Sequence, residues 1–416
     1  MIIKYFKLLK KKNFSLLWVS QIISQFGDRL TQVALVGLVS KASMSSSSLA
    51  IVMSMATIPV FIFSPISGVY IDRWSKRKTM YLSDLLRGIF IILIPIFFFI
   101  FKSLWPIYIL IFLSFSAGRF FIPAKMAFIP ELVEKKDIFL ANSLISVTGS
   151  IAAVLGIGLG GIIVDNYGVT NAFYIDSSTF IISGLCIFFI SKIEGGKIWA
   201  KDILNLSKDV VGTVKNTFIF EFKEGLKYIF NSHETKYAFK TYLFLFSYIG
   251  SLYVVMIRFI QNTLSTVTKD LGFAAVALGA GIFIGSLVYG WIAHKVSIKK
   301  IINIAVLSSS LFLIFFVILL KNYPYTLCAI LLSFILGLNI SPAFIGVNAL
   351  IHKSSDKKLL GRIFSGLEFI SHLGFLISMF ISSFFADLFN PFTVIKTIGI
   401  IGFIFSLILF FNNDKQ

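Results

Sequence analysis

Several ionisable side chains fall inside long apolar stretches of this sequence, and six of them are the groups most able to do chemistry: Asp28, Arg29, Arg119, Arg258, Glu368 and His372. A charge in such a stretch is costly unless it is paired or hydrated. These groups are therefore expected to form either a proton relay with a counter-charge for a bound solute, or structural ion pairs. Asp28–Arg119 and Glu368–Arg258 are the pairs that the second interpretation predicts, and His372 alone is equally consistent with a hydrogen-bonded core histidine.

The stretch 14–40 carries a wide polar face at helical spacing, formed by Ser20, Gln21, Ser24, Gln25, Asp28, Arg29, Thr31 and Gln32. Such a face is unfavourable against lipid and is expected to line a cavity. A carboxyl group whose ionisation responds both to burial and to a nearby cation can couple proton release to ligand binding. We therefore expect Asp28 and Glu368 to carry the protons. The other expected cavity residues are Ser24, Gln25, Arg29, Arg119, Arg258 and His372.

The elements that position these groups follow from composition. The chain has 416 residues, of which 57% are hydrophobic and 14% charged, and its mean hydropathy is +0.90. Soluble globular chains carry about 25% charged residues, so soluble enzymes, secreted scaffolds and disordered proteins are excluded. The pattern predicts an all-α polytopic membrane protein with twelve spans of about 20 residues or more. They are 14–40, 48–71, 79–101, 104–128, 138–164, 169–191, 237–263, 273–294, 299–321, 324–350, 360–387 and 391–411.

Lysine and arginine number 38 against 19 acidic residues, a formal charge of +19. The basic residues gather in alternate loops between the predicted spans, which by the positive-inside rule places both termini in the cytoplasm. The expected location of the chain is the plasma membrane. No basic stretch has the pattern of a nucleic-acid binder. The segment 14–40 is too long for a signal peptide and is expected to be retained as the first span.

Several kinds of site are absent from the sequence pattern. Cys186 and Cys328 both lie in apolar runs, so neither a disulfide framework nor a metal site is expected. No Walker loop is present, which excludes ATP-driven pumping by this chain. No cofactor and no catalytic triad are expected, and the chain is interpreted as a non-enzyme.

An internal repeat divides the chain. Gly68 to Lys78, after the second span, matches Gly290 to Lys300, after the eighth, and Pro123-Ala124 in the fourth span matches Pro342-Ala343 in the tenth. The predicted domains are an N-terminal six-helix bundle (1–191), a cytoplasmic linker with an amphipathic helix at 220–230 (192–236) and a C-terminal six-helix bundle (237–416). Parallel halves of this kind suit alternating access to a midplane site.

The loop after the second span resembles the signature of the major facilitator superfamily, through Gly68, Asp72, Arg73, Arg77 and Lys78, extended by Asp84 and Arg87. Further motifs resemble its drug-efflux branch of macrolide-efflux and siderophore-exporter proteins: Ser24-Gln-Phe-Gly-Asp28, Phe121-Ile-Pro-Ala124, Ala141-Asn-Ser143 and Gly361-Arg-Ile-Phe364. The resemblance implies two pseudo-symmetric bundles of six helices. It also implies that Asp72 closes the cytoplasmic side against the eleventh span, with Arg73, Arg77 and Arg87 completing the cluster. The alternative is that the basic residues only set topology.

The fifth predicted span contains Gly149, Gly156, Gly160 and Gly161. The antiporter motif of the family reads Gly-Pro-x-x-Gly-Gly, and Ile157 stands here in place of its proline. An antiporter role and plain small-residue helix packing therefore both remain open.

The resemblance implies a secondary active transporter, and the leading hypothesis is a proton-coupled exporter of bulky hydrophobic or cationic compounds, such as macrolide-like antibiotics, that confers multidrug resistance. The arginines at 29, 119 and 258 keep open a dedicated exporter of a siderophore or peptide natural product. Uptake, a non-transporting receptor or immunity protein, and a lipid-modifying membrane enzyme are further alternatives. The expected partners are a small-molecule substrate, protons and the lipid bilayer, and the chain is expected to be a monomer.

Overall fold

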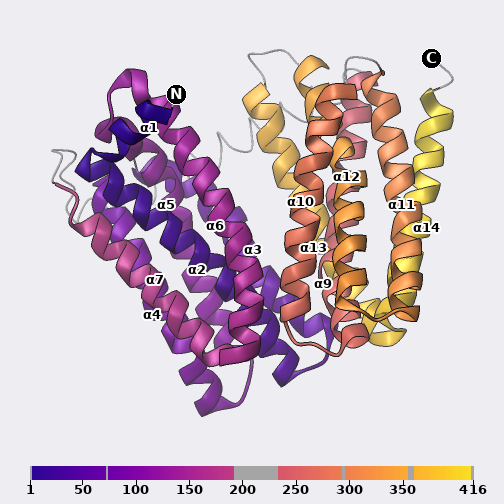
Figure 1. Ribbon diagram of the computed structural model, residues 1–416, viewed down its shortest axis with the longest axis horizontal. Coiled ribbons are helices and arrows are strands. Elements are labelled where there is room, and N and C mark those ends of the chain that lie inside the picture. The colour runs from indigo at the N-terminus through magenta and orange to yellow at the C-terminus, as the bar shows by residue number, and fades with distance from the viewer. Residues whose placement is uncertain (1, 72–73, 192–232, 293–295, 355–359, 414–416) are drawn as a thin grey trace. The chain divides into compact units, whose positions relative to one another are not determined.

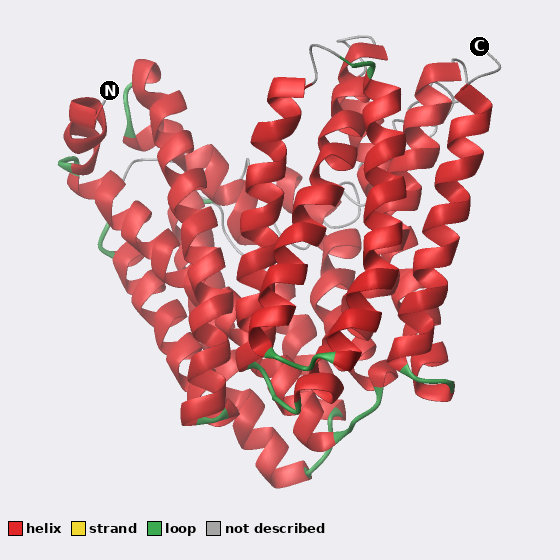
Figure 2. Cartoon of the chain, turned by 45° about the vertical axis from the view of Figure 1, so that its right-hand side comes forward, coloured by secondary structure: helices red, strands yellow, loops and turns green. Residues whose placement is uncertain are grey.

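The computed structural model describes residues 2–71, 74–191, 233–292, 296–354 and 360–413. Within these ranges the regular elements are helices and no strand occurs (Figure 2). The predicted linker helix at 220–230, Asp72 and Arg73 lie outside the described residues, as does most of the predicted linker.

A long helix covers most or all of each of the twelve predicted spans in the described part of the chain. These helices are α2 (Lys12–Ala42), α3 (Ser46–Ile71), α4 (Lys76–Phe101), α5 (Trp105–Leu132), α6 (Ile138–Tyr167), α7 (Val169–Phe188), α9 (His233–Leu264), α10 (Lys269–Ile292), α11 (Ile298–Asn322), α12 (Thr326–Ser354), α13 (Leu360–Leu388) and α14 (Pro391–Asn413). A short helix α1 (Ile2–Leu9) precedes α2, and a 3₁₀ turn η1 (Lys135–Asp137) precedes α6.

Among the described residues, 11 helices are long and apolar enough to cross a membrane. The long helix outside that group is α2, which has 31 residues but carries the polar face read from the sequence. Its length suffices for a span, since a helix of that length rises about 46 Å. The all-α polytopic fold is therefore confirmed, and α2 is its most polar long helix.

The helices form two compact units (Figure 1). Unit 1 contains α1, α2, α4 to α7 and α3 from Ile51 onward, whereas unit 2 contains α9 to α14 together with residues 44–50. In unit 1, α2 packs against α6 and α7, and α4 packs against α5 and α7. In unit 2, α9 packs against α13 and α14, and α11 against α12 and α14. These four contacts therefore join equivalent helices in the two units, as the internal repeat predicts.

Polar contacts at one end of unit 1 fix the direction of its helices. Lys11, before α2, lies 3.3 Å from Glu134, after α5, and Lys76 at the start of α4 pairs with Glu131 in the last turn of α5. Arg77 donates to backbone carbonyls at the end of α7. The starts of α2 and α4 thus meet the ends of α5 and α7, as expected for helices that alternate in direction.

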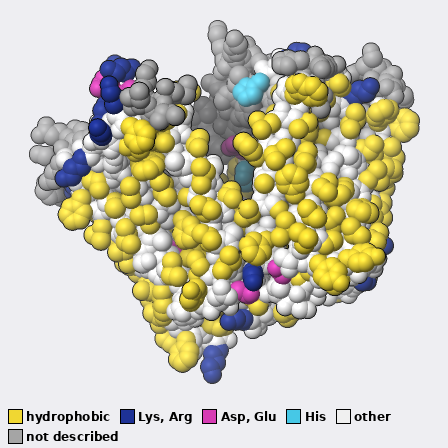
Figure 3. Space-filling model, in the orientation of Figure 1, with side chains coloured by type: hydrophobic (Ala, Val, Ile, Leu, Met, Phe, Trp, Pro, Cys, Tyr) yellow, Lys and Arg dark blue, Asp and Glu magenta, His cyan; other side chains and the backbone are white. Residues whose placement is uncertain are grey.

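The outward faces of the helices are apolar. Figure 3 shows hydrophobic side chains over much of the visible surface, and large ones such as Phe99 and Phe139 are 82% and 83% exposed. Lipid tails are as apolar as these side chains, so such a surface is stable only in a bilayer. The polar network described below lies among the helices of unit 1 instead.

Candidate functional site

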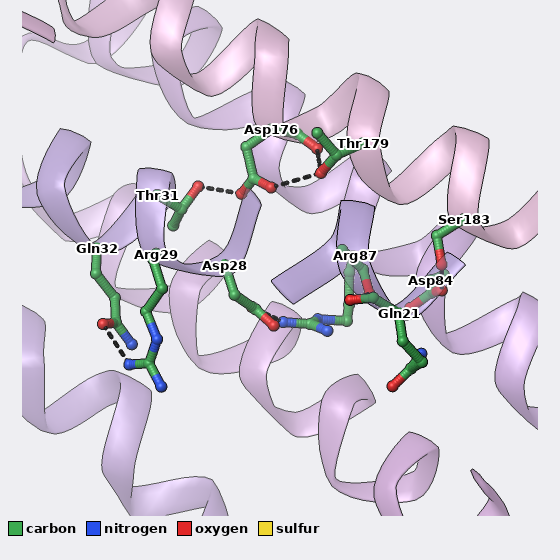
Figure 4. A network of polar contacts seen from close by, with 11 residues as sticks. Gln21, Asp28, Arg29, Thr31, Gln32, Asp84, Arg87, Asp176, Thr179 and Ser183 are labelled. Atoms are coloured by element: carbon green, nitrogen blue, oxygen red, sulfur yellow. Dashed lines mark hydrogen bonds and ion pairs between the residues drawn. The ribbon is translucent and has the colours of Figure 1, made fainter. Parts of the chain in front are cut away.

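An ion pair between Asp28 and Arg87 lies at the centre of a polar network in unit 1 (Figure 4). Asp28 comes from the middle of α2, and Arg87 comes from α4, about three turns after its start. The Arg87 side chain is 9% exposed and that of Asp28 is 30% exposed. The carboxylate can therefore be reached from outside the network, while the guanidinium cannot.

The guanidinium of Arg87 is held in place by two other helices. Its Cζ lies 4.0 Å from the centroid of the Phe180 ring on α7, a cation–π contact. On the α5 side it faces Gly118, where a Cβ atom would lie 3.4 Å from the same Cζ. A glycine at 118 and an aromatic ring at 180 thus form a slot that directs Arg87 toward Asp28.

Asp84 lies one turn before Arg87 on α4 and is fully buried. The hydroxyl of Ser183 on α7 donates to its Oδ2 at 2.5 Å, while Oδ1 has no hydrogen-bond partner among the described residues. Arg87 interacts electrostatically with Asp84, and it forms its ion pair with Asp28. The single guanidinium therefore lies between two carboxyl groups.

A third carboxyl group, Asp176 on α7, is also fully buried. Thr31 on α2 and Thr179 on α7 donate their hydroxyls to its two oxygens. Gly27 makes this possible, because a Cβ atom there would overlap both Asp176 and Thr179. The absence of a side chain at 27 thus allows α2 and α7 to approach around a buried carboxyl group.

Two basic residues on α5 complete the network. Lys125 donates from Nζ to Oε1 of Gln21 on α2 at 2.9 Å. Arg119 is partly buried, and its Nε is buried with no hydrogen-bond partner in the described part of the chain. Both side chains interact electrostatically with Asp28. The network thus brings three acidic and three basic side chains together from α2, α4, α5 and α7.

This arrangement can transmit a change of charge between helices. If Asp28 gains a proton or binds a cation, its attraction for Arg87 falls, and Asp84 becomes the nearer anionic partner. A small displacement of the guanidinium then changes the contacts between α2 and α4. Groups of this kind inside spans are typical of ion and proton pathways.

The other predicted residues of α2 divide between two environments. Ser24 is buried, and its hydroxyl lies 3.5 Å from the carbonyl oxygen of Gln21. Gln25 faces α6, where its amide lies against Gly149. Arg29 is partly buried and donates to Gln32 at 2.9 Å. Some residues of the predicted polar face of α2 therefore belong to the network, whereas Gln25 contacts α6 and Arg29 contacts Gln32 of the same helix.

The glycines predicted to form an antiporter-like helix lie at a close helix contact. A Cβ atom at Gly156 would lie 2.6 Å from the backbone oxygen of Phe26, and one at Gly160 would lie 3.5 Å from Leu30. Gly149 contacts Gln25, and Gly161 is buried. The structure thus assigns three of these glycines to the packing of α6 on α2, and an antiporter role for them stays a prediction.

The residues of the predicted cytoplasmic gate are distributed over unit 1. Arg77 binds the end of α7, and Lys78 is exposed. Asp84 and Arg87, which were expected to join them, lie in the buried network instead, because the ten residues from Arg77 to Arg87 rise about 15 Å along α4. Gly68 lies in α3, and its contacts lie outside what the structure describes.

The predicted residues of unit 2 lie in two separate places. Glu368 is exposed, and Nδ1 of His372 lies 2.7 Å from the backbone oxygen of Glu368. Arg258 is 1% exposed. It donates to Gln261 at 3.1 Å and to the backbone oxygen of Ser45 at 2.9 Å.

Two alternatives raised by the sequence are therefore not realised. Arg258 interacts electrostatically with Asp387 near the end of α13, about five turns from Glu368, so it does not pair with Glu368. Asp28 pairs with Arg87 and has only a longer-range interaction with Arg119.

Sequence reasoning missed two members of the network. Asp176 lies about 10 Å into α7, where it accepts a hydrogen bond from Thr31 of another helix. Lys125 was not selected, although a lysine between Ala124 and Met126 in an apolar stretch was a usable signal. In the described residues no group of three or more His, Cys, Asp or Glu side chains could hold a metal ion.

Comparisons with known proteins agree with this architecture. The family described as transmembrane secretion effector matches residues 4–351. "Macrolide efflux protein A" of Streptococcus pyogenes is 21% identical over 389 residues, 91% of this chain and 90% of that protein. Two Bacillus subtilis proteins match over part of their length. "Uncharacterized MFS-type transporter YfiS" is 27% identical over 183 residues, 44% of this chain and 43% of its own. "Putative bacilysin exporter BacE" is 27% identical over 248 residues, which are 58% of this chain and 57% of that protein.

The fold is also that of solved structures. The nucleoside transporter NupG, solved as a point mutant, superposes with a TM-score of 0.69, covering 96% of this chain and 98% of that one, at 13% sequence identity. At this identity the likeness concerns the fold alone.

Proposed function

The chain belongs to the transmembrane secretion effector family of major facilitator transporters, and we propose that it exports bulky hydrophobic or cationic compounds, such as macrolide-like antibiotics, in exchange for protons. It is a multi-pass membrane protein of a superfamily that moves small molecules across membranes. Alternating access of the two units is the proposed mode of transport.

The Asp28–Arg87 ion pair is the observation that carries the proposal. In the proposed cycle, a proton on Asp28 weakens this pair and releases Arg87 toward Asp84. Loss of the proton restores the pair. A cationic or polar substrate near the exposed part of Asp28 competes with the proton for the same carboxylate, which couples the two fluxes. Glu368, exposed on α13, is the proposed second proton carrier.

A narrower substrate range is the second candidate function. In it, the chain exports one peptide or siderophore-like natural product. Arg119 and Lys125 favour it, because no ion pair in the described ranges includes either of them. The partial match to BacE, named as a bacilysin exporter, supports the same candidate.

The proposed location is the cell membrane, with both termini in the cytoplasm. The grouping of Lys11, Lys76 and Arg77 at one end of unit 1 supports this orientation, since cytoplasmic ends of spans collect basic residues. We expect the working unit to be a monomer that uses no ATP.

Growth of a pump-deficient bacterium under drug challenge tests the proposal. Cells would express the wild type, Asp28→Asn, or Asp165→Asn, a matched control at an exposed aspartate of α6. We expect the wild type and the control to confer resistance to several unrelated compounds. Resistance should disappear with Asp28→Asn and when the proton gradient is collapsed.

Wild-type resistance in cells with Asp28→Asn would contradict the coupling role of this carboxylate. If every variant including the wild type leaves the cells sensitive while the protein is present in the membrane, the single-product exporter becomes the better account.

A further inference from the structure

Three side chains of unit 1, Gln21 on α2 and Arg119 and Lys125 on α5, carry hydrogen-bond donors that have no acceptor in the described part of the chain. Arg119 makes no hydrogen bond there, and its Nε is buried. Lys125 has three N–H groups and donates one to Oε1 of Gln21. The Gln21 side chain is 2% exposed, and because its oxygen accepts from lysine, its Nε2 remains as a donor with no partner.

The helix directions place these donors along one seam. The start of α2 and the end of α5 lie at the same end of unit 1, so the two helices run in opposite directions. Lys125 is level with Gln21 through their hydrogen bond. Arg119 lies six residues before Lys125, about 9 Å back along the axis of α5. Asp28 lies seven residues after Gln21, about 10 Å forward along α2, so Arg119 and Asp28 lie at the same level. Arg119 and Lys125 both interact electrostatically with Asp28.

The acidic groups of the network are already engaged by others. Asp28 is ion-paired with Arg87, Asp84 accepts from Ser183, and Asp176 accepts from two threonines. None of these three described carboxyl groups accepts a hydrogen bond from Arg119 or Lys125. Partly buried cations without a close anionic partner are costly in a membrane protein, and such groups mark positions where a ligand supplies the opposite charge.

We propose that Arg119, Lys125 and Gln21 form a binding subsite for a carboxylate group of the transported compound. This inference rests on the proposed export function and favours its second candidate, the peptide or siderophore-like product. The unsatisfied polar groups of Arg119, Lys125 and Gln21 are all donors, which suits a group that only accepts. A guanidinium binds a carboxylate through two parallel N–H bonds, and the lysine adds a point charge. A substrate bound here is an amphipathic acid or zwitterion, such as a peptide with a free carboxyl terminus.

Binding to the purified full chain in a neutral detergent without lipid tests the subsite. The probes are N-acetyl-phenylalanyl-phenylalanine and its C-terminal amide, which differ only in the carboxylate. Titration calorimetry gives the dissociation constant of each. We expect the wild type to bind the acid at least about tenfold more tightly than the amide, and Arg119→Gln or Lys125→Gln to remove about tenfold of that preference.

Lys41→Gln is the matched control, because Lys41 is an exposed lysine on α2. This substitution should leave the preference for the acid unchanged. Arg119→Lys keeps the charge without the two-pronged geometry, and it should retain part of the preference even if the glutamine variant fails to fold. Equal affinities of the wild type for acid and amide would overturn the proposal. So would an undiminished preference in folded Arg119→Gln and Lys125→Gln proteins, or no saturable binding of the acid at millimolar concentration.

The result is independent of the growth assay. Acid-selective binding that is lost in both variants supports the subsite even if no drug resistance is observed. Drug resistance without acid-selective binding supports export but removes this subsite.

Discussion

The Asp28–Arg87 pair predicts an asymmetric cost for removing its two partners. Arg87→Gln leaves two carboxyl groups, Asp28 and Asp84, near each other without the guanidinium between them. Removing one member of a buried pair costs about 3–5 kcal/mol. Because Asp28 is 30% exposed and partly hydrated, the lower end applies, so we expect Arg87→Gln to lower the free energy of unfolding by about 3 kcal/mol.

Asp28→Asn is expected to cost less, about 1 kcal/mol, which is the net worth of one hydrogen bond. Arg87 then still has Asp84 as an electrostatic partner and keeps its contact with the Phe180 ring. In the double variant, residue 28 is a neutral asparagine, so losing the guanidinium no longer leaves two charged carboxyl groups side by side. The double variant should therefore cost about 1–2 kcal/mol less than the sum of the two single variants.

Reversible unfolding of the purified protein, followed by helical circular dichroism during a detergent titration, measures these free energies. The double-mutant cycle uses four proteins: wild type, Asp28→Asn, Arg87→Gln and the double variant. Additivity within about 0.3–0.5 kcal/mol would show that the two side chains do not interact in the folded protein. A larger cost for Asp28→Asn than for Arg87→Gln would refute the position of the guanidinium between two carboxyl groups.

Two further predictions concern Gly27 and Glu134 of unit 1. Gly27→Ala should lower the free energy of unfolding by about 1–3 kcal/mol, because its Cβ atom would overlap Asp176. Gly279→Ala, with nothing within 4 Å of the added atom, should lower neither that energy nor the thermal melting midpoint, and equal melting of the two variants would contradict the close contact. Hydrogen bonds from Lys136 and Lys11 hold the pKa of Glu134 below its ordinary value. The ionised Glu134 carboxylate therefore stabilises the fold at a pH above the pKa of an unfolded glutamate, and this stabilisation is lost as the pH falls through the lower pKa of the folded state. Melting midpoints measured below about pH 4 should therefore fall less steeply in Glu134→Gln than in the wild type; parallel curves would exclude this contribution.

The spans could be predicted from sequence because a bilayer imposes a simple requirement of length and apolarity. The break at Lys102 and Ser103 separates α4 from α5 as predicted, and the Asn390-Pro391 turn separates α13 from α14. Helix ends were harder to predict: α5 continues through Pro130 to Leu132, past the predicted end at 128. Its last turn is stabilised by the ion pair of Glu131 with Lys76, a contact between distant residues.

The members of the site could be found in part, but their partners could not. The periodicity of α2 identified Asp28 as a buried charge. The resemblance to the signature loop grouped Arg87 with Arg77, although the two residues lie about 15 Å apart along α4. Which arginine meets Asp28 depends on how α2, α4 and α5 cross, and on the space left by Gly118. Such packing details are not encoded in the spacing of residues along one helix.

The repeat makes the position of the charges informative. The first and third helices of unit 1 are joined by the Asp28–Arg87 ion pair. In the described residues of unit 2, the corresponding helices α9 and α11 are joined without an ion pair: the hydroxyl of Tyr237 donates to Asn303 at 2.6 Å, and Nζ of Lys299 lies 5.7 Å from the centroid of the Tyr237 ring. A neutral hydrogen bond is enough to hold two helices together in a membrane. Packing alone therefore does not require an ion pair between the first and third helices. Under the proposed proton coupling, the ion pair between the first and third helices of unit 1 is present because a charge must change there, and the partly exposed carboxylate of Asp28 is the member of the network at which such a change can begin.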